Sequence, residues 1–159
     1  MPATDRVRVK GRREGGSFAA LPHAIFRGRP DQPSPASRLS RSALALLVDL
    51  AMQYSGSNNG NICASHAVMK RLAPERWASA GTLDSALVEL VAEGFLEQTR
   101  QGGRNVASLY ALAWKAIDQG PHHAKPTTIA SQLWKPEHRE RRDRQFLTRW
   151  ESRQQRRSK

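Results

Sequence analysis

The stretch SAGTLDSALVELVAEGFLEQTRQGGRNVASLYALAW, residues 79–114, decides the fold that this sequence predicts. Its first half has a helical pattern, because four apolar residues recur at the spacing that puts them on one face: Leu83, Leu87, Leu90 and Val91. Ser79 is a good N-cap, and Gly94 is placed to end the helix, since glycine adopts the left-handed conformation at little cost. The sequence therefore predicts a helix from Ser79 to Gly94 with one face in a core.

The second half of the stretch predicts a β-hairpin. Phe95-Leu96 starts one strand, and residues 106–113 form the returning strand. Between the strands is the basic, glycine-rich tip Arg100-Gln101-Gly102-Gly103-Arg104-Asn105. We expect Gly102 and Gly103 to supply the positive φ angles that a tight hairpin requires. A helix followed by a strand, a basic tip and a strand is the second half of a winged helix-turn-helix, and this order favours a nucleic-acid ligand.

The first half of such a domain is predicted just upstream. Ser40 is placed to cap a helix over residues 41–54, in which one apolar stripe has helical spacing: Leu44, Leu47, Val48 and Ala51. Leu46 and Leu50 widen this stripe, so we expect the helix to be buried on most sides. A turn-rich loop, 55–61, and a short strand, 62–64, follow. Ser65 is placed to cap a second helix through Leu72, which Pro74 stops. The order of elements from residue 40 to 114 predicts an α+β, mainly α, winged helix-turn-helix.

Three segments resemble a family of winged-helix proteins: LSRSALALL at 39–47, SNNGNICA at 57–64 and GFLEQTRQGGRN at 94–105. The members of this family are largely uncharacterised and occur in proteobacterial phages, plasmids and integrated mobile elements. The resemblance covers roughly residues 17–115, and its most specific part is the TRQGGRN run at 99–105. It implies the winged-helix fold and, through the usual ligand of that fold, binding to DNA.

The third helix is poorly suited to reading bases. A recognition helix usually presents basic or amide side chains to the major groove, whereas this helix offers Thr82, Asp84, Ser85 and Glu89. We therefore expect double-stranded DNA to be held mainly through its backbone. The candidate contacts lie at the hairpin tip, in an N-terminal arm and in a C-terminal tail: Arg100, Gln101, Arg104 and Asn105; Arg8, Lys10, Arg12 and Arg13; and Arg139, Arg141, Arg142 and Arg144.

The charge of the chain is concentrated at its two ends. The formal net charge is +12 and the sequence pI is about 11.2. Residues 1–30 carry seven basic and two acidic side chains, residues 31–134 nine and eight, and residues 135–159 ten and four. A strongly basic protein favours a polyanionic partner, because phosphates that are neutralised release counterions. Because the net positive charge lies at the two ends of the chain, we expect these ends to make most of the contact with such a partner.

Composition shifts divide the chain into four parts. Residues 1–16 are a basic arm, and 17–115 are the winged-helix domain with an N-terminal docking segment. In that segment we expect four apolar side chains to pack on the domain: Phe18, Leu21, Ile25 and Phe26. Residues 116–134 read as a linker, and 135–159 as a basic helical tail that begins near Pro136.

Signals for catalysis and cofactors are missing from the sequence. Cys63 is the single cysteine, so no intramolecular disulfide is possible, and its apolar neighbours indicate a core position. The five histidines lack Cys or acidic partners at metal-ligand spacing, and Gly102-Gly103 lacks the Lys-Ser/Thr of a phosphate-binding loop. No apolar run is long enough to span a membrane, and the N-terminus lacks a secretory signal. We expect a cytoplasmic protein that is not an enzyme and needs no cofactor or metal.

Three functions remain open. The first is a DNA-binding regulator or replication accessory of a mobile element. The second is a protein-binding inhibitor or adaptor that docks on a nucleoprotein complex. The third is binding of RNA or single-stranded nucleic acid, with Tyr110 or tryptophans stacking on bases. An apolar patch of Phe146, Leu147 and Trp150 is expected to dock on the protein itself or on a second copy in a homodimer, or else to anchor another protein.

Overall fold

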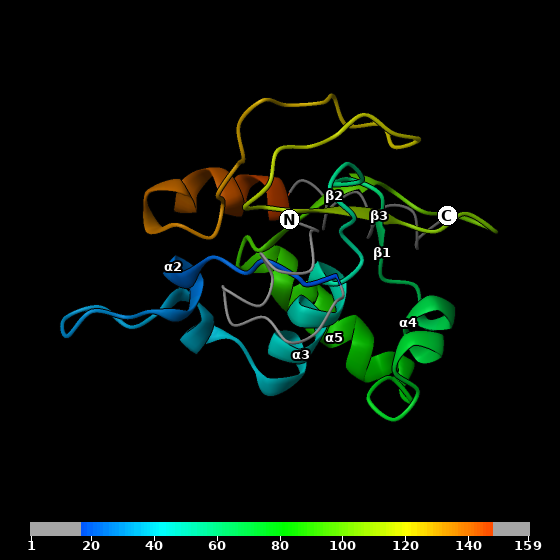
Figure 1. Cartoon of the computed structure of the whole chain (residues 1–159), viewed down its shortest axis with the longest axis horizontal. Helices are drawn as coiled ribbons and strands as arrows, with labels where there is room; N and C mark the ends of the chain where they lie inside the picture. The colour runs from blue at the N-terminus through cyan, green and yellow to red at the C-terminus, as the bar shows by residue number, and fades with distance from the viewer. Residues whose placement is uncertain (1–16, 148–159) are drawn as a thin grey trace, which may run out of the picture.

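The computed structural model describes residues 17–147, which form an α+β fold around a three-stranded antiparallel sheet (Figure 1). In chain order the elements are α2 (His23–Phe26), the 3-10 helix η1 (Pro35–Arg38), α3 (Arg41–Ala51), β1 (Ile62–Cys63), α4 (His66–Leu72), α5 (Ala80–Ala92), β2 (Leu96–Arg100), β3 (Leu109–Leu112) and the 3-10 helix η2 (Pro136–His138). The chain is helical again over 139–147. In Figure 1, α3, α4 and α5 lie below the sheet and the segment 115–135 passes above it.

Serine side chains start the three main helices, as predicted. Ser40, Ser65 and Ser79 each accept a hydrogen bond from the backbone N–H three residues further on. These bonds satisfy donors that the first turn of a helix leaves unpaired. At the other end of α5, Gly94 has a φ of 78°, which confirms the predicted left-handed residue there. The helices therefore begin where local capping chemistry places them, although α3 ends at Ala51, before the predicted residue 54.

The buried face of α3 differs from the predicted stripe. Its fully buried residues are Ala43, Leu46, Leu47 and Leu50, which also have the spacing i, i+3, i+4, i+7. Val48 is 39% exposed and Leu44 is only half-buried, so the stripe through these two residues is wrong. Two overlapping stripes in the sequence satisfy helical spacing, and packing of α3 against α5 selects one of them.

β3 is the central strand of the sheet, in the order β1-β3-β2. Ile62 pairs with Tyr110 on one side of β3, and Leu96 pairs with Leu112 on the other. The register of β2 shifts between Gln98 and Arg100, where the buried Thr99 hydroxyl donates to the Gly60 carbonyl oxygen at 2.6 Å. The predicted hairpin is present, but β3 is shorter than the predicted strand over 106–113.

The N-terminal docking segment packs through only part of its apolar residues. Ile25 is fully buried in the core, and Leu21 packs against it half-buried. Phe18 is 70% exposed and Phe26 41% exposed, so the expectation that all four side chains dock is wrong for the two phenylalanines. Burial of one isoleucine anchors the segment at α2.

Residues 116–134 lie against the domain and are hydrogen-bonded to it at several points, although their sequence reads as a linker. Backbone N–H groups of Asp118, His123 and Gln132 donate to carbonyls at Asn59, Thr99 and Ala113 respectively. Leu133 and Trp134 are buried, and the Trp134 ring stacks on Phe95 with a centroid distance of 6.5 Å. The packed core therefore includes residues beyond 115.

Candidate nucleic-acid interface

Arg104 and Asn105 form the outermost turn of the β2–β3 hairpin. Gly103 and Val106 exchange backbone hydrogen bonds of 2.9 and 3.2 Å across this turn. The left-handed residue is Asn105, with a φ of 60°, while neither Gly102 nor Gly103 has a positive φ. The predicted role of the glycine pair is therefore wrong, because asparagine, which tolerates this conformation, supplies it instead.

Gly102 is required for a different reason, which is the close approach of the two strands. A Cβ atom at Gly102 would lie 2.6 Å from both the Val106 carbonyl oxygen and the Ser108 backbone nitrogen. At Gly103 a Cβ atom would meet nothing within 4 Å. Gly102 thus sets the width of the hairpin below its tip, and Gly103 does not.

Arg100 holds the hairpin to a neighbouring loop. Its Nε and Nη2 donate to the Ala107 carbonyl oxygen at 3.2 and 3.0 Å, and its Nη1 donates to the Pro121 carbonyl oxygen at 3.3 Å. The expectation that Arg100 projects beyond the tip is therefore wrong, since its guanidinium is directed at backbone carbonyls. Arg104 and Asn105 are exposed at the turn, and the exposed Gln101 bonds to Gln98 and to the Gly102 carbonyl.

The exposed part of α5 is its N-terminal half, where Thr82, Asp84 and Ser85 face solvent. Glu89 does not belong to this surface. Its two carboxylate oxygens accept hydrogen bonds from the backbone N–H and the hydroxyl of Ser40 at 2.6 and 2.7 Å. Glu89 thus stabilises the start of α3, and its predicted place on a recognition surface is wrong.

The helix over 139–147 is attached to the end of α5 by Arg142. This side chain is buried, its Nη1 donates to the Glu93 carbonyl oxygen at 3.4 Å, and it lies 3.9 Å from the Glu93 carboxylate. Arg142 is therefore held by contacts within the fold, and its predicted contact with phosphate stays a prediction. The backbone at Gly94 permits this approach, since a Cβ atom there would lie 2.8 Å from the Arg142 side chain.

Three further arginines of this helix are exposed: Arg139, Arg141 and Arg144. Arg139 lies 3.8 Å from Asp143, and Arg141 donates to the Ser131 carbonyl oxygen at 2.7 Å. In the predicted apolar patch, Phe146 is half-buried and Leu147 is 55% exposed. Trp150 and the basic arm of Arg8, Lys10, Arg12 and Arg13 lie outside the described residues.

Arg76 is neutralised within the fold. It donates two hydrogen bonds to Asp49, at 3.1 and 2.9 Å, and the Trp77 indole N–H donates to the same carboxylate at 2.7 Å. These hydrogen bonds and the charge of Asp49 raise the pKa of Arg76 above its ordinary value. The sequence did not indicate this network, because its members are separated by a loop and a helix.

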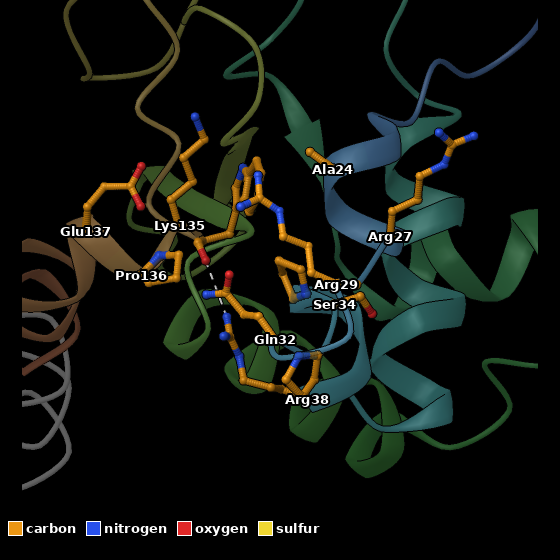
Figure 2. A pocket seen from close by; sticks show the side chains of 13 residues that line it. Ala24, Arg27, Arg29, Gln32, Ser34, Arg38, Lys135, Pro136 and Glu137 are labelled. Carbon is orange, nitrogen blue, oxygen red and sulfur yellow. Dashed lines mark hydrogen bonds between the residues drawn. The ribbon is translucent and has the colours of Figure 1, made fainter.

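A basic groove lies where the N-terminal segment meets the start of the C-terminal helix. One wall is the stretch from Arg27 to Arg38, and the other is Trp134 to Glu137. The groove has a volume of about 690 Å³. Figure 2 shows Arg29 and Lys135 projecting from opposite walls, with Arg38 below them. The sequence does not indicate this groove, because one wall lies in the predicted domain with its docking segment and the other lies where the predicted linker meets the tail.

Among the described residues, most exposed cations that are not paired with Asp49 fall into two groups, whereas Arg41 and Lys125 are exposed elsewhere. The first comprises Arg104 at the hairpin tip together with Lys70 and Arg71 at the end of α4. The second comprises the groove and the helix over 139–147. In Figure 1, α2 and this orange helix lie on one side of the molecule, and α4 lies on the other.

Neither a metal-binding cluster nor a membrane-spanning helix is present in the part of the chain that the structure describes. In this range no group of three or more His, Cys, Asp or Glu side chains is arranged to hold a metal ion. None of the helices that the structure describes has the length and apolar character needed to cross a membrane. No protein-family model, curated protein or solved structure matches this chain.

Proposed function

We propose that the protein is a winged-helix protein that binds double-stranded DNA, mainly through the phosphate backbone. The order α3, β1, α4, α5, β2, β3 and the central position of β3 are compatible with the winged-helix plan. The observation that carries the proposal is the exposed Arg104 at the outermost turn of the hairpin, in a chain of net charge +12. A cation at this position reaches a phosphate or a minor groove without disturbing the core.

Backbone contact rather than base reading is the proposed mode. The exposed residues at the start of α5 include Asp84 and no cation. This surface therefore has few hydrogen-bond donors for base edges, and its negative charge repels phosphate. When the affinity comes from cations outside this helix, it depends weakly on the base sequence of the DNA and strongly on the salt concentration. The resemblance to a winged-helix family, which covers roughly residues 17–115, supports the further proposal that the protein is a regulator or a replication accessory of a mobile element.

The test is a binding panel with three fluorescently labelled ligands of equal length: a duplex of arbitrary sequence, single-stranded DNA and RNA. We expect the duplex to bind most tightly. The logarithm of its binding constant should fall linearly with the logarithm of salt concentration, because bound cations displace counterions. Absence of binding to all three ligands at low salt would contradict the proposal.

The second candidate is a protein-binding adaptor, and the surface that favours it is the end of the helix over 139–147. Leu147 is 55% exposed there, which offers apolar area to a partner. Failure of the nucleic-acid panel would make this function the leading one. Binding of single strands by base stacking receives less support, because Tyr110 is only 5% exposed and lies in the core.

A further inference from the structure

We propose that the groove between residues 27–38 and 134–137 binds phosphate groups of the nucleic-acid backbone. This site is separate from the hairpin tip and from the start of α5. The inference rests on the proposed function and adds the location of a second contact. It is carried by three features of the described residues: walls that are anchored by core residues, cations that are only partly neutralised, and a size suited to a nucleotide.

The N-terminal wall is held in place at both ends. Ile25, just before the wall, is fully buried, and Ala36, near its C-terminal end, is 5% exposed. Between them, Arg29 and Gln32 exchange backbone hydrogen bonds of 2.7 and 3.1 Å, which close a tight turn. Gly28 is packed so closely that a Cβ atom there would lie 3.0 Å from the Ser34 nitrogen. The turn that carries Arg29 is therefore closed by contacts within the loop, which lies between Ile25 and Ala36, two residues that are buried in the core.

The C-terminal wall is held by aromatic packing and by a link to the other wall. Trp134 is 5% exposed and stacks on Phe95. The backbone of Lys135 is therefore attached directly to a buried residue. Arg38 Nη2 donates to the Trp134 carbonyl oxygen at 3.3 Å, a bond drawn as a dashed line in Figure 2. Both walls thus keep their separation, and a bound anion needs little ordering of the protein.

The cations of the groove are only partly neutralised. Arg38 is paired with Glu93 at 2.8 Å. The Arg29 side chain has no hydrogen bond or ion pair within the described residues, and the Lys135 ammonium lies 5.7 Å from the centroid of its neighbour's indole ring. Glu137 is the one acidic side chain among the described residues that line the groove. Like charges that a fold holds together repel one another, and an anion between them relieves that repulsion.

The ligand has to come from outside the chain. Residues 1–16 carry five basic and two acidic side chains, and residues 148–159 carry five and one. Neither terminal segment complements a positive groove. A volume of about 690 Å³ lies within the usual range for ligand sites and exceeds what a single phosphate fills. The helix over 139–147 follows the groove directly in the chain and exposes Arg139, Arg141 and Arg144 beside Glu140 and Asp143. A ligand with repeated phosphates fits cations in both places better than an isolated anion does.

The experiment compares single substitutions in the full-length chain, with binding to a labelled duplex measured over a range of salt. Arg29→Ala and Lys135→Ala should each weaken binding about fivefold and lower the salt slope by roughly 1, the effect of one lost phosphate contact. Glu137→Gln should strengthen binding, because it removes the acidic side chain of the groove. Lys125→Ala is the matched control, since Lys125 is exposed in a loop and does not line the groove; it should leave binding unchanged.

A second measurement locates the contact without substitution. Lysine acylation followed by mass spectrometry should show Lys135 protected by duplex while Lys125 stays reactive. Unchanged binding by both groove variants, with Lys135 still reactive in the complex, would overturn the groove site and leave the proposed function intact. If the parent protein binds no duplex, the proposed function fails first. Competition by inorganic phosphate or a mononucleotide at concentrations similar to those of the duplex would overturn the assignment to a polymer backbone.

Discussion

Asn59 connects the loop before β1 to residues 112–118, which are more than fifty positions away in sequence. Its side-chain Nδ2 donates to the backbone carbonyl oxygens of Leu112, Lys115 and Ala116 at 3.0–3.1 Å. Its side-chain Oδ1 accepts from the Leu112 backbone N–H at 2.7 Å. Its backbone N–H donates to the Asp118 carboxylate at 2.8 Å. With 1% exposure, this residue is a buried polar group whose bonds are made inside the protein.

Replacement of Asn59 by alanine should lower the free energy of unfolding by roughly 2–4 kcal/mol, because buried carbonyl and N–H groups lose their partners. Urea unfolding followed by circular dichroism measures this change. Gln101→Ala is the control, since Gln101 is an exposed amide at the hairpin, and it should shift stability by less than about 0.5 kcal/mol. A stable Asn59→Ala variant would show that water replaces the amide at little cost.

Side-chain roles were the least predictable level of the structure. The caps Ser40, Ser65 and Ser79 were predicted correctly because a cap depends on the few residues next to it. Arg142 and Glu89 were assigned to ligand contacts, but their partners lie 49 residues away in sequence in each case. Composition shows that such residues are charged, whereas only tertiary packing determines whether the charge meets a ligand or the protein itself.

At the level of elements, the hairpin gives different roles to two arginines, Arg100 and Arg104, for which the sequence predicted the same role. Arg100 bonds to backbone carbonyls, and Arg104 is exposed at the turn. Arg104→Ala should weaken duplex binding about fivefold and leave the melting temperature unchanged, because an exposed side chain contributes little to folding. Fluorescence anisotropy and thermal unfolding measure the two quantities.

The companion variant Arg100→Ala should act through stability instead. It leaves the Ala107 and Pro121 carbonyls without their donor, at a cost of roughly 1–2 kcal/mol in the free energy of unfolding. If Arg100→Ala weakened duplex binding as much as Arg104→Ala and left stability unchanged, Arg100 would have to contact the ligand after all. Leu87→Ala calibrates the stability scale, since Leu87 is a buried core residue whose truncation costs roughly 2–5 kcal/mol.

The glycine pair provides a second matched comparison in the same hairpin. Gly102→Ala should destabilise the protein by roughly 1–3 kcal/mol, because its methyl group would meet backbone atoms of Val106 and Ser108 at 2.6 Å. Gly103→Ala has open space and an ordinary φ, so it should be neutral. Thermal melts of the two variants test this difference. Equal melting temperatures would mean that the strands separate freely to accept the methyl group at Gly102.

For the whole molecule, helical and strand patterns predicted the α+β class and the order of elements from 40 to 114, because these depend on periodicity along the chain. They did not predict that residues 116–134 lie against the domain. Few periodic apolar residues mark this stretch, and its attachment depends on single hydrogen bonds and on Trp134. The basic groove was missed for the same reason, since its two walls are brought together by that attachment.

The extent of the folded unit is therefore open to a truncation test. A chain ending at residue 115 lacks Leu133 and Trp134, which are buried against the core and Phe95. Loss of one buried tryptophan typically costs roughly 3–5 kcal/mol, a large part of the 5–15 kcal/mol available to a small domain. We expect the chain 1–115 to unfold at much lower urea than the chain 1–134, which retains both residues. Coincident unfolding curves would instead show that 116–134 is only a connector between the domain and its basic tail.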